Sequence, residues 1–183
     1  MESIINSFLL VAVSEIGDKT QLLSFVLASR FKKPWPIIWG ILIATILNHG
    51  LASYLGVASF NFIPLQYHKW ILSLTFLVFG FWILIPDKEE EVQNKGKFGP
   101  FLTSLILFFI AEMGDKTQLA TIALGAQYQS TWAVTVGTTL GMMAANVPAV
   151  FLGDKILKKV PLNRIRQIAF VLFLLFALYI ALV

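Results

Sequence analysis

The stretch SEIGDKTQ, residues Ser14 to Gln21, places a glutamate, an aspartate and a lysine within five residues of an otherwise apolar run. The apolar run begins at Ile4 and resumes at Leu22. A second copy, AEMGDKTQ, occupies Ala111 to Gln118 and also has apolar sequence on both sides. The chain therefore carries the same charged cluster twice inside its most apolar regions.

Composition indicates an integral membrane protein. Of the 183 residues, 57% are hydrophobic and 13% charged, the mean hydropathy is +0.79, and the apolar residues form long blocks rather than stripes. A helix needs about 20 residues to cross a hydrocarbon core about 30 Å thick, and the alternating strands of a β-barrel are absent. We predict an all-α, polytopic fold with six transmembrane helices over residues 4–29, 36–60, 70–85, 100–126, 131–152 and 166–183.

The distribution of basic residues predicts the topology. Twelve lysines and arginines lie outside the two charged clusters, and eleven of them follow the first, third and fifth spans, while only Lys69 follows the second. By the positive-inside rule these three loops are cytoplasmic and both termini lie outside. The pI of about 9.4 is then a topology signal, and a nucleic-acid partner is not expected.

The chain contains an internal repeat at a constant offset of 97 residues. The offset aligns both charged clusters and also pairs Trp35 with Trp132 and Gly40 with Gly137. We predict a first three-helix repeat over residues 1–86, a cytoplasmic linker over 87–99 and a second three-helix repeat over 100–183. Because each repeat has an odd number of spans, the second enters the membrane from the opposite side, and such inverted repeats are typical of secondary transporters.

Helix geometry places the two acidic clusters near the bilayer midplane. Glu15 lies about 16 Å from the start of its span and Glu112 about 18 Å from the start of its own. On a continuous helix Glu15 and Asp18 share a face, as do Glu112 and Asp115. Gly17 and its counterpart in the second copy would allow close backbone approach or a local break. We expect four carboxylates to converge on one point and to hold a metal ion.

The sequence allows two interpretations of these acids. They could form buried ion pairs with the charge-balancing Lys19 and Lys116, which would pin the helices together. Four carboxylates against two lysines leave two negative charges, and one charge at the membrane centre costs about 2.5 to 3.5 kcal/mol on insertion scales. We therefore favour a functional site, because the deficit suits one divalent cation or two protons.

Neutral side chains near the clusters are possible additional ligands or relay groups. Hydroxyl and amide oxygens suit magnesium, calcium and manganese, and the absence of cysteine excludes a thiolate site. His49, inside the second span, is open to two interpretations: a helix contact, which we favour, and a ligand or proton relay. The candidate oxygen ligands are Thr20, Gln21, Asn48, Thr117, Gln118 and Asn146.

The two motifs, Glu15-Ile16-Gly17-Asp18-Lys19-Thr20 and Glu112-Met113-Gly114-Asp115-Lys116-Thr117, carry a family resemblance. The doubled pattern within two three-span units resembles the Golgi, chloroplast and bacterial family of manganese and calcium exchangers, whose signature is E-x-G-D-[KR]-[ST]. The resemblance covers essentially the whole chain. It implies a cation:proton antiporter whose motif acids hold the ion, in a compact bacterial form located in the inner membrane.

The expected function is export of a divalent ion, Mn²⁺ in preference to Ca²⁺, from the cytoplasm in exchange for protons. The metal is cargo, and no cofactor is expected. Alternatives are an exporter of a cationic amino acid and a passive divalent-cation channel. An enzyme is not expected, because no H-E-x-x-H or comparable constellation is present.

Overall fold

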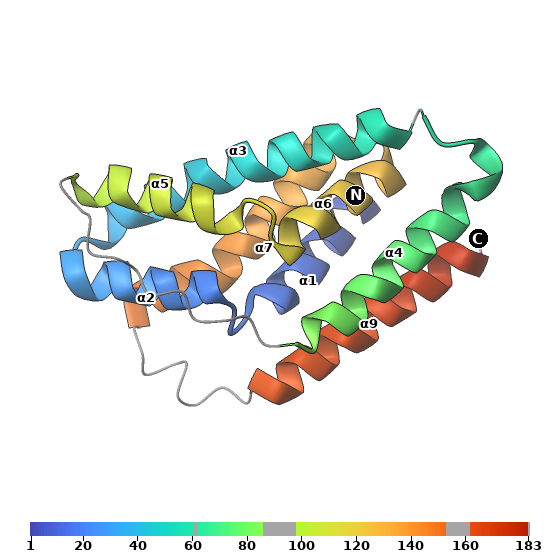
Figure 1. Ribbon diagram of the computed structural model, residues 1–183. Helices are drawn as coiled ribbons and strands as arrows, with labels where there is room; N and C mark the ends of the chain where they lie inside the picture. The colour runs from blue at the N-terminus through green and yellow to red at the C-terminus, as the bar shows by residue number, and fades with distance from the viewer. Residues whose placement is uncertain (61, 86–97, 153–161, 183) are drawn as a thin grey trace.

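The computed structural model describes residues 1–60, 62–85, 98–152 and 162–182, and all regular elements within them are helices (Figure 1). The predicted all-α class is confirmed. Three of the described helices are long and apolar enough to cross a membrane: α3 (Pro34–Phe60), α7 (Thr131–Leu152) and α9 (Leu162–Leu182). The shorter helix α4 (His68–Ile83) follows a 3₁₀ turn, η1 (Leu65–Tyr67).

The first and fourth predicted spans are each two helices rather than one. The first consists of α1 (Glu2–Glu15) and α2 (Lys19–Phe31), and the fourth of α5 (Pro100–Glu112) and α6 (Lys116–Tyr128). The breaks lie at Gly17 and Gly114, whose φ angles of 83° and 78° are disfavoured for residues with a Cβ. The local break that these glycines allow is therefore present, and the expectation that Glu15 and Asp18 share a face of one continuous helix is wrong.

The local geometry of the first half recurs 97 residues later. The starts of α2 and α6 have this spacing, as do those of α3 and α7. The residues that cap the C-termini of α2 and α6, Lys32 and Gln129, are both left-handed, with φ of 53° and 48°. The same sequence pattern has thus produced the same sequence of helix, break, helix and cap in both halves.

The two halves are interlocked rather than separate. α1 packs mainly against α7, and α5 packs mainly against α3, so the first helix of each half lies against the other half. These crossings are close because they use glycine: a Cβ on Gly40 would lie 2.6 Å from the carbonyl oxygen of Phe101, and one on Gly137 would lie 2.5 Å from that of Ile4. Small residues that allow this approach are typical of helix packing in membranes.

The pair α4 and α9 lies side by side along one edge of the bundle (Figure 1). α9 packs against α1 and α4 packs against α6, and within the described residues neither helix makes a comparable contact with α2 or α5. Phe76 of α4 and Phe173 of α9 are in one apolar core with Leu10 and Leu124. A second core joins α2, α3 and α5 through Leu27, Ile41 and Phe108, among others. The breaks at Gly17 and Gly114 separate helices that belong to different cores.

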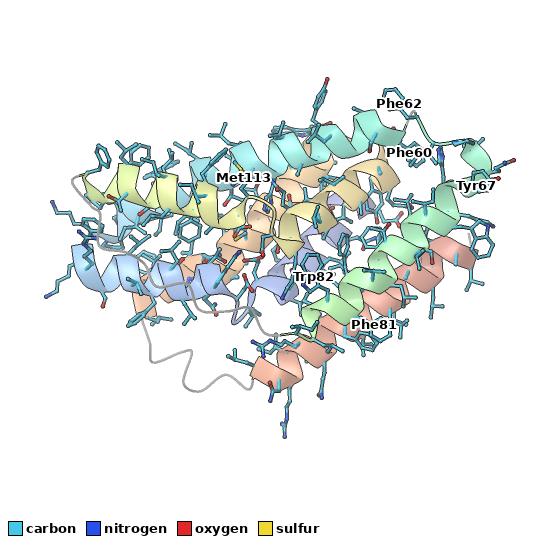
Figure 2. The ribbon with its side chains drawn as sticks, in the orientation of Figure 1. Phe60, Phe62, Tyr67, Phe81, Trp82 and Met113 are labelled. Atoms are coloured by element: carbon cyan, nitrogen blue, oxygen red, sulfur yellow. The ribbon has the colours of Figure 1, made fainter. Side chains whose placement is uncertain are left out.

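Apolar side chains cover the outside of the bundle. Phe81 of α4 is 56% exposed and points outward, as do many of the side chains drawn in Figure 2. Phe62 and Tyr67 are exposed at the turn between α3 and α4. Water would be a poor solvent for so much apolar surface, whereas lipid is a good one. Together with the long apolar helices, this surface identifies an integral membrane protein.

Candidate metal centre

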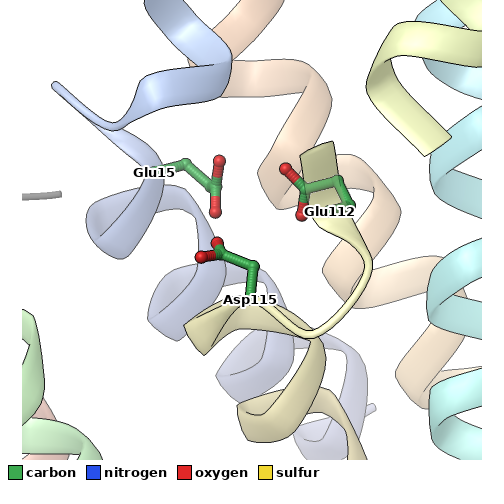
Figure 3. A group of neighbouring side chains, drawn as sticks. All are labelled: Glu15, Glu112 and Asp115. Atoms are coloured by element: carbon green, nitrogen blue, oxygen red, sulfur yellow. The ribbon is translucent and has the colours of Figure 1, made fainter. Parts of the chain in front are cut away.

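Three carboxylates from the two motifs meet where the broken helices end. Glu15 is the last residue of α1, Glu112 is the last of α5, and Asp115 directly precedes α6. One carboxylate oxygen from each lies within 4.8 Å of the other two, and all three side chains are buried. Figure 3 shows the three carboxylates pointing toward one another. The fold therefore brings three acidic groups together in a buried region from which most water is excluded.

Asp18, the fourth predicted acid, is placed beside this group and is not a member of it. It directly precedes α2, is half-buried, and lines a small cavity of about 20 Å³ that Asp115 and Lys116 also line. A cavity of this size accommodates roughly one water molecule. Neither Asp18 nor Asp115 makes the side-chain capping hydrogen bond to its own helix that an aspartate at this position commonly makes. The Asp115 carboxylate belongs to the buried acidic group, and Asp18 lines the adjoining cavity.

The motif threonines hold Glu15 in place from both halves of the chain. The hydroxyl of Thr20 donates to Glu15 Oε2 at 2.7 Å, and the hydroxyl of Thr117 donates to Oε1. Both threonines were candidate ligands, and both are at the centre. A carboxylate that accepts two hydroxyl donors is fixed in orientation, which prepares its remaining lone pairs for an ion.

The motif glutamines stabilise the breaks. Gln21 Oε1 accepts a hydrogen bond from the Gly17 amide at 2.8 Å, and Gln118 Oε1 accepts one from the Gly114 amide at 2.7 Å. The same atoms were candidate metal ligands, and each is instead engaged one turn away from its glycine. These bonds satisfy amides that the interrupted helices would otherwise leave without an intrahelical partner.

The two lysines are in different surroundings. Lys19 Nζ is 3.2 Å from Asp115 Oδ1, an ion pair that joins the first motif to the second. Lys116 Nζ donates to the carbonyl oxygen of Ile85 at 2.9 Å, just after the end of α4. Lysine at a helix C-terminus interacts favourably with the helix dipole. Lys19, which was expected to balance charge, therefore has an ion-pair partner in the acidic group.

The two candidate asparagines are both fully buried. Asn48 donates to the carbonyl oxygen of Phe109 at 3.0 Å, which ties α3 to α5. Asn146 accepts from the Ser24 hydroxyl at 2.7 Å and donates to the Met142 carbonyl at 3.1 Å. The Asn48 bond and the Ser24–Asn146 bond are interhelical, as is typical of buried amides in membrane proteins, and the Asn146–Met142 bond lies within α7.

Two further residues lie near the acidic group or the cavity beside it. His49, for which a helix contact was favoured, is fully buried, and its Nε2 is 4.0 Å from Glu112 Oε2. Arg166, the first residue of the sixth predicted span, lines the cavity with Asp18, and α9 begins at Leu162, four residues before that span. The sequence signal that could have indicated this position was an arginine at the edge of an apolar run. Arg166 lies one turn inside the observed start of α9.

Comparison with known proteins agrees with the resemblance. The model of the family described as "Divalent cation/proton antiporter GDT1" matches residues 3–91 and 100–182. A protein of Vibrio cholerae named "Putative manganese exporter" is 52% identical over 170 residues, which cover 92% of this chain and 84% of that protein. "GDT1-like protein sll0615" of Synechocystis is 32% identical over 92% of this chain and 91% of its own length.

A plant relative extends the comparison to eukaryotes. "GDT1-like protein 4" of Oryza sativa subsp. indica is 30% identical over 94% of this chain and 70% of its own length. No solved structure matches the chain. The family describes transporters, so the expectation that the chain is not an enzyme is confirmed. With the family model covering nearly the whole sequence and both acidic motifs in the matched segments, the chain belongs to the GDT1 family of divalent cation/proton antiporters.

Proposed function

We propose that the protein exports Mn²⁺ from the cytoplasm in exchange for protons, and that the acidic group is the transport site. The observation that carries this proposal is the convergence of Glu15, Glu112 and Asp115 within 4.8 Å in a buried position. Metal needs ionised carboxylates, so protons and a metal ion compete for the same oxygens. Occupation of one group of acids by either the ion or the protons couples their movements in opposite directions.

The donor set supports a hard divalent ion. Carboxylates and hydroxyls are the ligands that Ca²⁺, Mg²⁺ and Mn²⁺ accept, and Thr20 and Thr117 hold Glu15 in a fixed orientation. We choose Mn²⁺ over Ca²⁺ because the relative from Vibrio cholerae carries the name of a manganese exporter. Asp18, beside the cavity, would complete the set of four acids when the ion is bound.

We further propose six transmembrane spans arranged as two inverted three-helix repeats, residues 1–86 and 100–183, joined by a linker over 87–99. In support, α1 and α5 run toward each other from opposite ends of the bundle (Figure 1). Each continues after its break as α2 or α6, so that two half-helices together provide one span. Discontinuous helices that meet at a substrate site near the midplane are a recurring feature of inverted-repeat transporters.

The basic loops indicate which ends of the helices face the cytoplasm and which face the outside. With these loops in the cytoplasm of a bacterium and the protein in its inner membrane, both termini lie outside, and α1 and α6 form the outer half of the site. α4 and α9 pack against this outer half and leave α2 and α5 without comparable contacts in the described chain. This packing suits a state that is closed to the outside. Movement of α4 and α9 toward α2 and α5 would give the opposite state.

Purified protein in proteoliposomes tests the proposal. Mn²⁺ is placed on one side, a pH gradient is imposed, and metal and proton movement are recorded with separate indicators. We expect metal to move against protons and the metal gradient to collapse when a protonophore clamps the pH. Asp115→Asn should be inserted in the membrane and inactive, because it removes a desolvated charge and a proposed ligand.

Three outcomes would contradict the proposal. Flux of the divalent ion to the same level with the gradient present, reversed or absent indicates a passive channel. Inhibition by lysine and arginine, with transport of these amino acids and none of metal, indicates a cationic amino-acid exporter. Transport of Ca²⁺ with exclusion of Mn²⁺ would replace the proposed ion.

A further inference from the structure

His49 is a buried polar side chain directed at the acidic group. It lies in α3 with no exposed surface, and neither of its ring nitrogens has a hydrogen-bond partner among the residues that the structure describes. Burial of a polar group without a partner costs free energy, and almost all buried polar groups in proteins are paired. We therefore expect the ring nitrogens of His49 to gain a partner during transport.

The distance between His49 and Glu112 suits a shared ion better than a hydrogen bond. His49 Nε2 and Glu112 Oε2 are 4.0 Å apart, beyond the range of about 2.7 to 3.2 Å for a hydrogen bond from nitrogen to oxygen. Two ligands of one ion with bond lengths of about 2.1 to 2.5 Å lie roughly 3 to 4.3 Å apart at ordinary coordination angles. An ion at Glu112 thus has the His49 nitrogen within reach.

The second half of the chain has no equivalent group. The residue 97 positions after His49 is Asn146, whose amide is engaged with the Ser24 hydroxyl and the Met142 carbonyl. A nitrogen donor is therefore available from one half only, beside Glu112. The asymmetry matters because the four motif acids themselves are duplicated and offer only oxygen.

We propose that His49 is a specificity-determining residue of the transport site, whose neutral imidazole binds the ion through Nε2 next to Glu112. This inference rests on the proposed function. Calcium and magnesium are hard ions that take oxygen ligands, whereas imidazole is a good ligand for first-row transition metals. One nitrogen among the oxygens favours Mn²⁺ over Ca²⁺ and Mg²⁺ and would allow export of a scarce ion in the presence of abundant ones.

A spectroscopic experiment tests the direct bond. The chain has two histidines, His49 and His68, so labelling with ¹⁵N-histidine marks only these rings. Mn²⁺ is added to the labelled protein in detergent, and electron spin echo modulation records nitrogen coupled to the bound metal. His68, whose Nε2 is 2.6 Å from the Ile63 carbonyl oxygen, supplies the matched control. We expect the ¹⁵N coupling in wild type and in His68→Gln, and its loss in His49→Asn.

Selectivity provides the second readout. Asparagine occupies the equivalent position in the second half, so His49→Asn should fold, and it replaces nitrogen by an oxygen donor. We expect the ratio of Mn²⁺ to Ca²⁺ affinity to fall at least about ten-fold, the lower end of what loss of groups around metal sites commonly causes. Ser53→Ala, one turn further along α3, should leave the ratio unchanged, since the Ser53 hydroxyl bonds to the Thr131 carbonyl.

The outcomes separate this inference from the proposed function. If Mn²⁺ binds and is transported but shows no ¹⁵N coupling in wild type, or if His49→Asn keeps the wild-type ratio, His49 is a packing residue and the transport proposal stands. If wild-type protein binds no Mn²⁺, both proposals are wrong. Coupling that disappears in His68→Gln and remains in His49→Asn would also overturn the assignment.

Discussion

Lys19 and Asp115 form an ion pair across the two halves of the molecule, with 3.2 Å between Nζ and Oδ1. Each comes from a different copy of the same motif, and Asp115 is nearly completely buried while Lys19 is half-buried. In the arrangement described, the lysine supplies positive charge at the place where a divalent ion would supply more. The stability of the protein should therefore depend both on this ion pair and on whether a metal ion occupies the site.

Replacement of Lys19 by methionine should make stability depend on metal. Lys19→Met leaves Asp115 without its cation, and we expect the free energy of unfolding to fall by about 1 to 3 kcal/mol, less than for a fully buried pair. Mn²⁺ should restore more stability to the variant than to wild type, because it replaces the missing charge. Thermal unfolding in detergent with and without Mn²⁺ measures this. Lys19→Arg is the control, and a metal-free Lys19→Met as stable as wild type would count against the pair.

The two break glycines should differ in their tolerance of alanine. Both have positive φ, so either substitution introduces backbone strain of roughly 1 to 2 kcal/mol. A Cβ at Gly17 would also lie 2.3 Å from Leu162 Cδ2, whereas one at Gly114 meets nothing within 4 Å. We expect both variants to unfold at a lower temperature, with Gly17→Ala the less stable. The reverse order would show that the space around these breaks differs from that described.

Thr117 should act through its hydroxyl on Glu15. Thr117→Val keeps the shape of the side chain and removes a hydrogen bond to a buried carboxylate, so the KM for Mn²⁺ should rise about ten-fold, as for other groups that orient metal ligands. Thr117→Ser retains the donor and should stay within about three-fold of wild type. Initial rates of Mn²⁺ transport in vesicles give both values. Equal effects of valine and serine would remove the orienting role.

Much of this fold could be predicted from the sequence, because a duplicated apolar pattern can form only a few arrangements of helices in a membrane. Long apolar runs predict helices, and Gly17, two residues after Glu15, allows the observed break. Gln21 could not be assigned in the same way: an amide next to four acids looks like a ligand, and only the turned backbone shows that its oxygen is used by the Gly17 amide.

The asymmetric contacts of the two motifs within the acidic group could not be predicted from the sequence. The motifs are almost identical, yet both motif threonines donate to Glu15, and Lys19 of the first motif pairs with Asp115 of the second. Such differences arise from how helices of opposite halves pack, which depends on close crossings such as that of Gly40 with Phe101. The approach of His49 to Glu112 has the same origin, since α3 packs against α5.

Topology can be tested cleanly because the chain has no cysteine. We expect Gln93→Cys, in the predicted linker, to react with a membrane-impermeant thiol reagent only from the cytoplasmic side. Gln66→Cys, exposed in η1, should react only from outside. Intact cells and inverted vesicles provide the two sides. Labelling of both residues from the same side would overturn the proposed inverted repeats, and exchange of the two sides would reverse the orientation.

Proton release on metal binding tests the central claim most directly. Mn²⁺ is added to purified protein in weakly buffered detergent solution, and a pH indicator records protons released for each ion bound. We expect release by wild type, because the ion displaces protons from the buried glutamates Glu15 and Glu112, and a loss of both binding and release in Glu15→Gln, Glu112→Gln and Asp115→Asn. Mn²⁺ binding with no release of protons, or binding of wild-type strength in all three variants, would contradict it.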